Sequence, residues 1–351
     1  MFDHRHYVPV LRWKRGEWRA LKRVGEADRD LITPLLEFTP TDLGANGVDE
    51  RLEEHAATMA DCWGPRFALI DTALVPSSIQ GARGRHPLLV FAEHAHSNQL
   101  GAVPVTGLDR DAGSRTAARE AARRLGTGAA IRLRRPDFIR PDLGGQVADL
   151  CEFLGLVPEQ LDLILDYGRS DSSAPAFGTV LSRIPRLREW RTLTAISGAF
   201  PKDLSSFSVG EHDYPRADWI WWRDQVRPPH RLPRVPAYGD YTTQHAVFSE
   251  PPARANFSAS IRYAAENHWV VMRGEGVFKD DGPGFAQWPT NAQLLCDREE
   301  FCGAEFSAGD GYIFDTGQQI EKTGNAETWL AAAVNHHLVF TARQIATLFG
   351  P

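Results

Sequence analysis

Cysteine is scarce in this chain of 351 residues, which has only Cys62, Cys151, Cys296 and Cys302 and no Cys-x-x-Cys pair. Cys296 and Cys302 are six positions apart, and no histidine follows them at zinc-finger spacing, so the pattern argues against a structural zinc site. The start of the chain has no signal-peptide pattern. We therefore expect reduced thiols and a cytoplasmic protein.

Long apolar runs and an excess of positive charge are also lacking. No apolar stretch reaches the roughly 18 residues that a membrane-spanning helix needs, so we expect no membrane segment. The formal net charge is −6, which argues against a general nucleic-acid binder held by a basic surface. A local basic groove remains an alternative, because arginines cluster at 132–140.

Motifs that mark common nucleotide-binding and hydrolase folds are missing. The chain has no Gly-x-Gly-x-x-Gly turn, no phosphate-binding loop ending in Gly-Lys, and no Gly-x-Ser-x-Gly elbow. What is present is the composition of a folded protein with a sizeable core, 42% hydrophobic and 24% charged.

Short aliphatic runs alternate with helical patterns along the first 245 residues. We expect strands at 7–13, 32–38, 66–72, 101–107, 128–134, 161–167, 192–198 and 235–241. We expect helices at 16–25, 49–64, 114–126, 144–155, 177–190 and 217–226, whereas 86–100 could be helix or strand. Eight such units predict a (β/α)8, TIM-barrel-like fold of parallel strands covered by helices. A doubly wound open sheet is the alternative.

The tail breaks this rhythm. It has an apolar stretch at 258–276 and helical patterns at 291–303 and 341–350. We expect residues 1–245 to form the barrel and residues 246–351 to form a C-terminal β/α elaboration packed on it; a separate C-terminal domain is the alternative.

Acidic residues stand at the ends of four of the expected strands: Glu37, Asp71, Asp166 and Asp240. The carboxyl ends of barrel strands meet in one mouth, where the chemistry of such folds takes place. Converging carboxylates hold Mg²⁺ or Mn²⁺, or divide into a general acid and a general base. Asp71, Asp166 and Asp240 are the candidate metal ligands. The opposite interpretation is a set of charges that simply pair.

Four further residues are candidates for substrate binding. Lys14 and Arg132 carry the charge that a phosphate or carboxylate group needs, so a nucleotide or nucleic acid is a candidate substrate. Tyr238 lies beside the acid of the eighth strand, and Arg262 lies on a tail strand that could reach the mouth. The tryptophans of ADWIWWRD (217–224) could stack on bases, but a helix that packs its aromatic side on the barrel is the favoured interpretation.

Two segments near the start carry a family resemblance. YVPVLRWKRGEWRAL and ITPLLEF resemble the opening of the beta family, whose members have a Tyr-x-Pro-aliphatic strand, a Lys-x-Gly-Glu turn and an Ile-x-Pro-aliphatic-aliphatic-Glu strand. These correspond to 7–10, 14–17 and 32–37, and the segments LDLILDYG, YGDY and SIRY are similar too. The resemblance implies occurrence in phages and in mobile or defence-associated bacterial loci. It supplies no reaction and no residue roles.

Three functions follow from these observations. The first is a metal-dependent phosphohydrolase or phosphodiesterase, in which Asp71, Asp166 and Asp240 work with Glu37 in support and the substrate is bound by the cations. The second is a non-catalytic partner or sensor subunit that docks another protein from the same defence locus. The third is a glycoside hydrolase that uses two of the acids. Acids converging on an open pocket would favour an enzyme, and buried ion pairs would favour the partner.

Overall fold

The structure is a computed structural model that describes residues 2–44, 47–170, 176–227, 232–250, 256–278 and 280–349. The chain divides into two compact units. Unit 1 comprises residues 1–13, 32–198 and 218–240, and unit 2 comprises residues 14–31, 199–217 and 241–351. The boundary at residue 245 stays a prediction; in this division, segments 14–31 and 199–217 also belong to unit 2.

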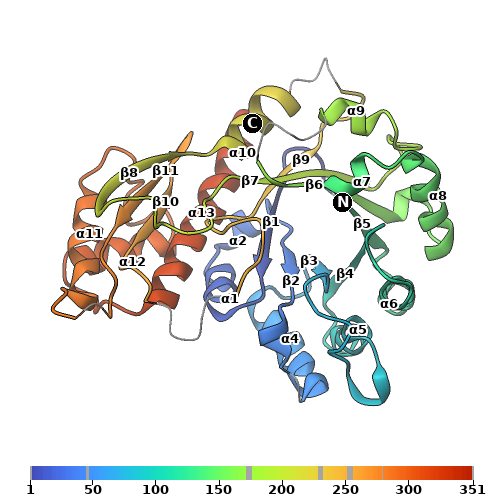
Figure 1. The fold of residues 1–351 in the computed structure, drawn as a ribbon, viewed down its shortest axis with the longest axis horizontal. Coiled ribbons are helices and arrows are strands. Elements are labelled where there is room, and N and C mark those ends of the chain that lie inside the picture. The colour runs from blue at the N-terminus through green and yellow to red at the C-terminus, as the bar shows by residue number, and fades with distance from the viewer. Residues whose placement is uncertain are drawn as a thin grey trace. The chain divides into compact units, whose positions relative to one another are not determined.

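Unit 1 is a closed barrel of eight parallel strands (Figure 1). Around the barrel these are β1 (Tyr7–Arg12), β2 (Leu35–Glu37), β3 (Phe67–Asp71), β4 (Gly101–Thr106), β5 (Ala129–Arg134), β6 (Leu161–Arg169), β7 (Thr192–Gly198) and β9 (Ala237–Asp240). The barrel closes where β9 pairs with β1 on one side and β7 on the other. All eight predicted strands and the barrel class are confirmed.

Helices alternate with these strands, as the sequence pattern predicts. They are α3 (Pro40–Leu43), α4 (Val48–Cys62), η1 (Ala82–Gly84), α5 (Pro87–Ser97), α6 (Ala112–Leu125), α7 (Arg135–Phe138), α8 (Leu143–Leu154), η2 (Pro158–Gln160) and α9 (Phe177–Leu181). The ambiguous segment 86–100 is the helix α5, which begins with Pro87 at its first position. The helix predicted over 177–190 is wrong beyond Leu181, because Pro185 disfavours helical backbone just before it.

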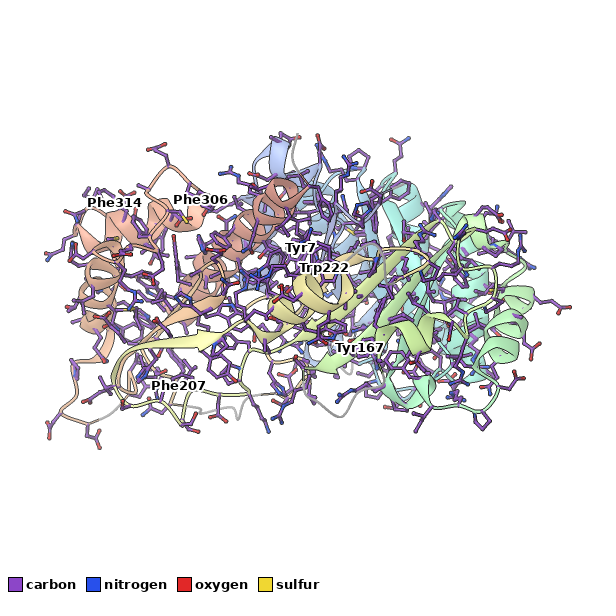
Figure 2. All side chains as sticks on the ribbon, turned by 90° about the horizontal axis from the view of Figure 1, so that it is seen from above. Tyr7, Tyr167, Phe207, Trp222, Phe306 and Phe314 are labelled. Atoms are coloured by element: carbon purple, nitrogen blue, oxygen red, sulfur yellow. The ribbon has the colours of Figure 1, made fainter. Side chains whose placement is uncertain are left out.

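A pair of tryptophans covers one side of the barrel near β9. The helix α10 (Ala217–Trp221) continues as a π-helical turn, η3 (Trp222–Val226). The rings of Trp219 and Trp222 are buried and lie 5.3 and 5.4 Å from the ring of Tyr238. Tyr7 of β1 stacks on Tyr238 as well, and Figure 2 labels Tyr7 and Trp222. These two tryptophans therefore pack in the core, as predicted, and are not exposed for stacking on bases.

Unit 2 contains a three-stranded antiparallel sheet in the order β10-β11-β8. Its elements are α1 (Arg15–Lys22), α2 (Glu26–Arg29), β8 (Gly210–Pro215), β10 (Ile261–Ala264), β11 (His268–Arg273), η4 (Gly284–Ala286), α11 (Gln287–Cys296), α12 (Ala308–Gly317) and α13 (Ala326–Leu348). The helix predicted over 291–303 lies at 287–296 instead, and the helix predicted over 341–350 is the end of the much longer α13. Among the described helices, none combines the length and apolar character needed to cross a bilayer.

Candidate functional site: a charge cluster at the carboxyl end of the barrel

The register of the barrel strands brings charged side chains to one end. Glu37 ends β2 and Asp71 ends β3, and the two residues are register partners. On the other side of β4, Arg134 of β5 is the register partner of Asp166 on β6. Arg132 lies two positions before Arg134 on the same strand, so both side chains point to the same face. Acids and arginines from four strands therefore meet at the carboxyl end.

One guanidinium group holds three of the acids. The Nη1 atom of Arg132 donates to Glu37 Oε1 and to Asp71 Oδ2, each at 2.7 Å. Its Nε and Nη2 atoms donate to Asp166 Oδ2 at 2.9 and 2.7 Å. Each of these four residues is 3% exposed or less. Three of the four acids that the strand-end pattern selects therefore converge, but they converge on an arginine rather than on an open pocket.

Other arginines surround the same acids. Arg110 Nη2 lies 3.0 and 3.1 Å from the two carboxylate oxygens of Asp71. Arg134 has a nitrogen within 4.0 Å of each of the three acids, and Arg12 Nε lies 3.9 Å from Glu37. We use "charge cluster" for these residues: Arg12, Glu37, Asp71, Arg110, Arg132, Arg134 and Asp166. The charge cluster contains four cations and three anions, so its acids are fully neutralised.

The ionisation of Asp71 follows from these contacts. Burial alone would raise the pKa of Asp71, because it penalises the charged form. The positive charges of Arg110, Arg132 and Arg134 outweigh burial and hold the pKa of Asp71 well below its usual range. Asp71 is therefore a fixed anion near neutral pH.

Asp240 and Tyr238 form a further buried group on β9. Asp240 accepts hydrogen bonds from the phenol of Tyr7 at 2.5 Å and from that of Tyr238 at 3.1 Å. Both candidate residues are completely buried. The phenol of Tyr238, which the sequence suggests for substrate binding, is therefore engaged with the neighbouring carboxylate.

Lys14 and Arg262 belong to unit 2. Lys14 Nζ lies 3.1 Å from Glu250 Oε2 and 5.0 Å from the ring centre of Phe248. Arg262 is on β10, where its Nη1 atom donates to the carbonyl oxygen of Thr243 at 2.7 Å. Both residues belong to unit 2, whereas the acids of the charge cluster belong to unit 1.

Sequence reasoning missed three members of the charge cluster. Arg134 could have been selected from the sequence, because it shares a strand face with Arg132. Arg12 could have been selected too, because it ends β1 as Glu37 and Asp71 end β2 and β3. Arg110 lies in the loop after β4, where no strand-end pattern marks it.

Metal-ligand geometry occurs elsewhere in the part of the chain that the structure describes. Asp213, His268 and Glu300 offer donor atoms that all lie within 4.8 Å of one another in unit 2. Arg298 Nη2, however, donates to Asp213 Oδ1 and to Glu300 Oε1, each at 2.9 Å. Hydrogen bonds from Arg298 chiefly lower the pKa of Glu300, to about 2. A cation is thus already present among these ligands, so they make a poor metal site.

The family model described as Beta protein matches residues 7–343 of this chain. No curated protein and no solved structure gives a significant match.

Proposed function

This chain belongs to the Beta protein family, and on that premise we propose that it is a non-catalytic partner or sensor subunit of a phage-related or anti-phage system that docks another protein. The observation that carries the proposal is the closed charge cluster. Arg132 engages Glu37, Asp71 and Asp166 at once, and none of the four is accessible to a substrate.

Catalysis by these acids would require carboxylates that are released from Arg132 and accessible to a substrate. Removing Arg132 from three buried carboxylates would cost at least the roughly 3–5 kcal/mol that breaking a buried ion pair costs. A general acid or base also works best when its pKa lies near the operating pH, whereas the pKa of Asp71 is held far below its usual range. Both arguments favour a structural role, in which the cluster joins β2, β3, β5 and β6 into a rigid scaffold.

The phage-related context rests on the family. We expect members of this family to occur in phages and in mobile or defence-associated bacterial loci, and that expectation motivates a protein partner from the same locus. The shortage of free positive charge, with a net charge of −6, favours a protein over a nucleic acid as the main partner.

A second candidate is a metal-dependent phosphohydrolase or phosphodiesterase that uses Mg²⁺ or Mn²⁺ at the barrel mouth. The observation in its favour is that Arg134 keeps 29% of its side chain exposed on the charge cluster. An exposed guanidinium could bind a phosphate group, and the acids would then have to be released from Arg132 to bind a metal.

Co-expression with the products of neighbouring genes tests the docking role. We expect one of them to co-purify with this chain as a complex of fixed stoichiometry in size-exclusion chromatography with light scattering. The proposal is overturned if the chain stays alone with each neighbour's product but hydrolyses a phosphate ester when Mn²⁺ is added.

A further inference from the structure

Unit 2 contains a cavity of about 770 Å³. One wall is the extended segment that leads into β10, with Phe257, Ser260 and Arg262. The first part of α13 also lines the cavity, with Trp329 and Leu330. All residues that line the cavity belong to unit 2. Its volume falls within the roughly 300–1,000 Å³ of small-molecule sites.

Arg262 is the distinctive polar group of this cavity. Its Nη1 atom donates to the Thr243 carbonyl oxygen at 2.7 Å, and its guanidinium lies 4.8 Å from the ring centre of Phe200. Among the residues that the structure describes, it has no carboxylate partner. A guanidinium has five N–H donors, and within the described part of the chain Arg262 donates one hydrogen bond. Loss of hydration lowers the pKa of Arg262 to about 10, at which it is still a cation near neutral pH.

Arg132 and Arg262 differ in their partners among the described residues. Arg132 is buried with three carboxylates, whereas Arg262 is partly buried with a carbonyl and an aromatic ring. A charge removed from water is costly unless it is paired. A ligand with an anionic group would supply the missing counter-charge.

The acids of the cavity wall limit the charge of that ligand. Glu250 pairs with Lys14 at 3.1 Å, and Asp203 accepts from the backbone N–H of Ser205 at 2.9 Å and from its hydroxyl. The two acids are balanced by Lys202 and Arg262 among the residues that line the cavity, so the wall has no excess positive charge to hold a polyanion such as a triphosphate. One anionic group is the best match.

The apolar part of the wall defines the rest of the ligand. Phe257 and Leu330 line the cavity and are partly exposed. Trp288 and Trp329 also line the cavity, and their buried rings stack with centres 5.8 Å apart. We propose that this cavity binds a small organic anion, whose single phosphate or carboxylate group pairs with Arg262 and whose apolar or aromatic body packs between Phe257 and Leu330.

Isothermal titration calorimetry with two sets of probes tests this site. The probes are the four nucleoside monophosphates and a set of aromatic carboxylates, with inorganic phosphate as the fragment that lacks a body. We expect millimolar or tighter binding of at least one organic anion, and weaker binding of inorganic phosphate. The set that binds identifies the source of the anionic group.

Variants then locate the binding. Arg262→Gln should weaken it by about tenfold or more, since it removes the charge-assisted pair. Arg273→Gln is the matched control, because Arg273 lies on the neighbouring strand β11 and donates to carbonyl oxygens outside the cavity wall. Leu330→Trp, which fills the cavity without altering Arg262, should also abolish binding. If Arg262→Gln fails to fold, Leu330→Trp alone tests whether the ligand binds in this cavity.

The proposal is overturned if no probe binds the native chain at millimolar concentration. It is equally overturned if binding survives both Arg262→Gln and Leu330→Trp. Binding that is lost in Asp166→Asn but kept in both cavity variants would place the ligand in the barrel instead. This site lies within unit 2, so its failure would leave the docking role of the chain untouched.

Discussion

Replacing Arg132 with methionine is expected to lower the free energy of unfolding by about 3–5 kcal/mol, because three buried carboxylates lose the cation that they share. Methionine keeps much of the side-chain volume, so the loss reports charge and hydrogen bonding. Arg132→Lys should recover part of the stability, since an ammonium group keeps the charge but lacks the planar fork. Urea unfolding followed by circular dichroism measures the difference. Arg169→Met, at an exposed position on β6, is the control.

The pH dependence makes this prediction specific. In the native protein the pKa of Asp71 is lowered, so its contribution to stability is present above the unfolded value of about 4 and is lost as pH falls through the folded value. In Arg132→Met the buried acids repel one another without the cation that they share, so protonation relieves that repulsion and the variant gains stability on acidification. The difference in unfolding free energy between the native protein and Arg132→Met should therefore decrease as pH falls towards 4. A difference that stays constant with pH would contradict the role assigned to Arg132.

Asp310→Asn is expected to lower the free energy of unfolding by about 3 kcal/mol or more. Asp310 is completely buried on α12 and accepts hydrogen bonds from Tyr263 Oη at 2.7 Å and from Ser307. His336 Nδ1 lies 2.9 Å from the same carboxylate, and its Nε2 lies 2.9 Å from the carbonyl oxygen of Ala264. Asparagine replaces one of the two carboxylate oxygens with an NH2 donor, so at least one of these donors loses its acceptor inside the core.

The contribution of Asp310 to the free energy of unfolding also depends on pH. Burial alone would raise the pKa of Asp310, but the charge of His336 and the hydrogen bonds from His336, Ser307 and Tyr263 outweigh it and lower that pKa. Its contribution to stability is thus present above about pH 4 and lost as pH falls through the folded value. The difference in unfolding free energy between the native protein and Asp310→Asn, measured by urea unfolding, should decrease on acidification.

His336→Gln and the double variant complete a thermodynamic cycle. A coupling energy near zero between Asp310 and His336 would show that the two do not form an ionic pair.

The barrel could be predicted because its information is local. Most strands are short aliphatic runs buried over most of their length, as β1 and β4 are over all of theirs, and most are followed by a helix with its own start and stop residues. Unit 2 was harder to read. The strand β8 has the sequence GEHDYP, is mostly exposed, and pairs with β11 more than 50 residues later. The helix α12 contains three glycines, which weaken a helical pattern.

The charge cluster was only partly visible in the sequence. Strand ends pointed to Glu37, Asp71 and Asp166, and the structure brings these acids together with Arg132. No pattern along the chain could show that one guanidinium reaches all three, because that depends on distances across the barrel. The same limit applies to Arg262, whose lack of a carboxylate among the described residues is a property of the folded chain.

We propose that the acids of the charge cluster stabilise the barrel and do not bind a metal ion. Thermal melting of the native protein and of Asp166→Asn, each with and without Mn²⁺, tests this proposal most directly. We expect Asp166→Asn to melt about 5–10 °C lower than the native protein, and we expect Mn²⁺ to leave the melting temperature of both proteins unchanged. A rise in the melting temperature of the native protein with Mn²⁺ that is lost in Asp166→Asn would place a metal at the barrel mouth and contradict it.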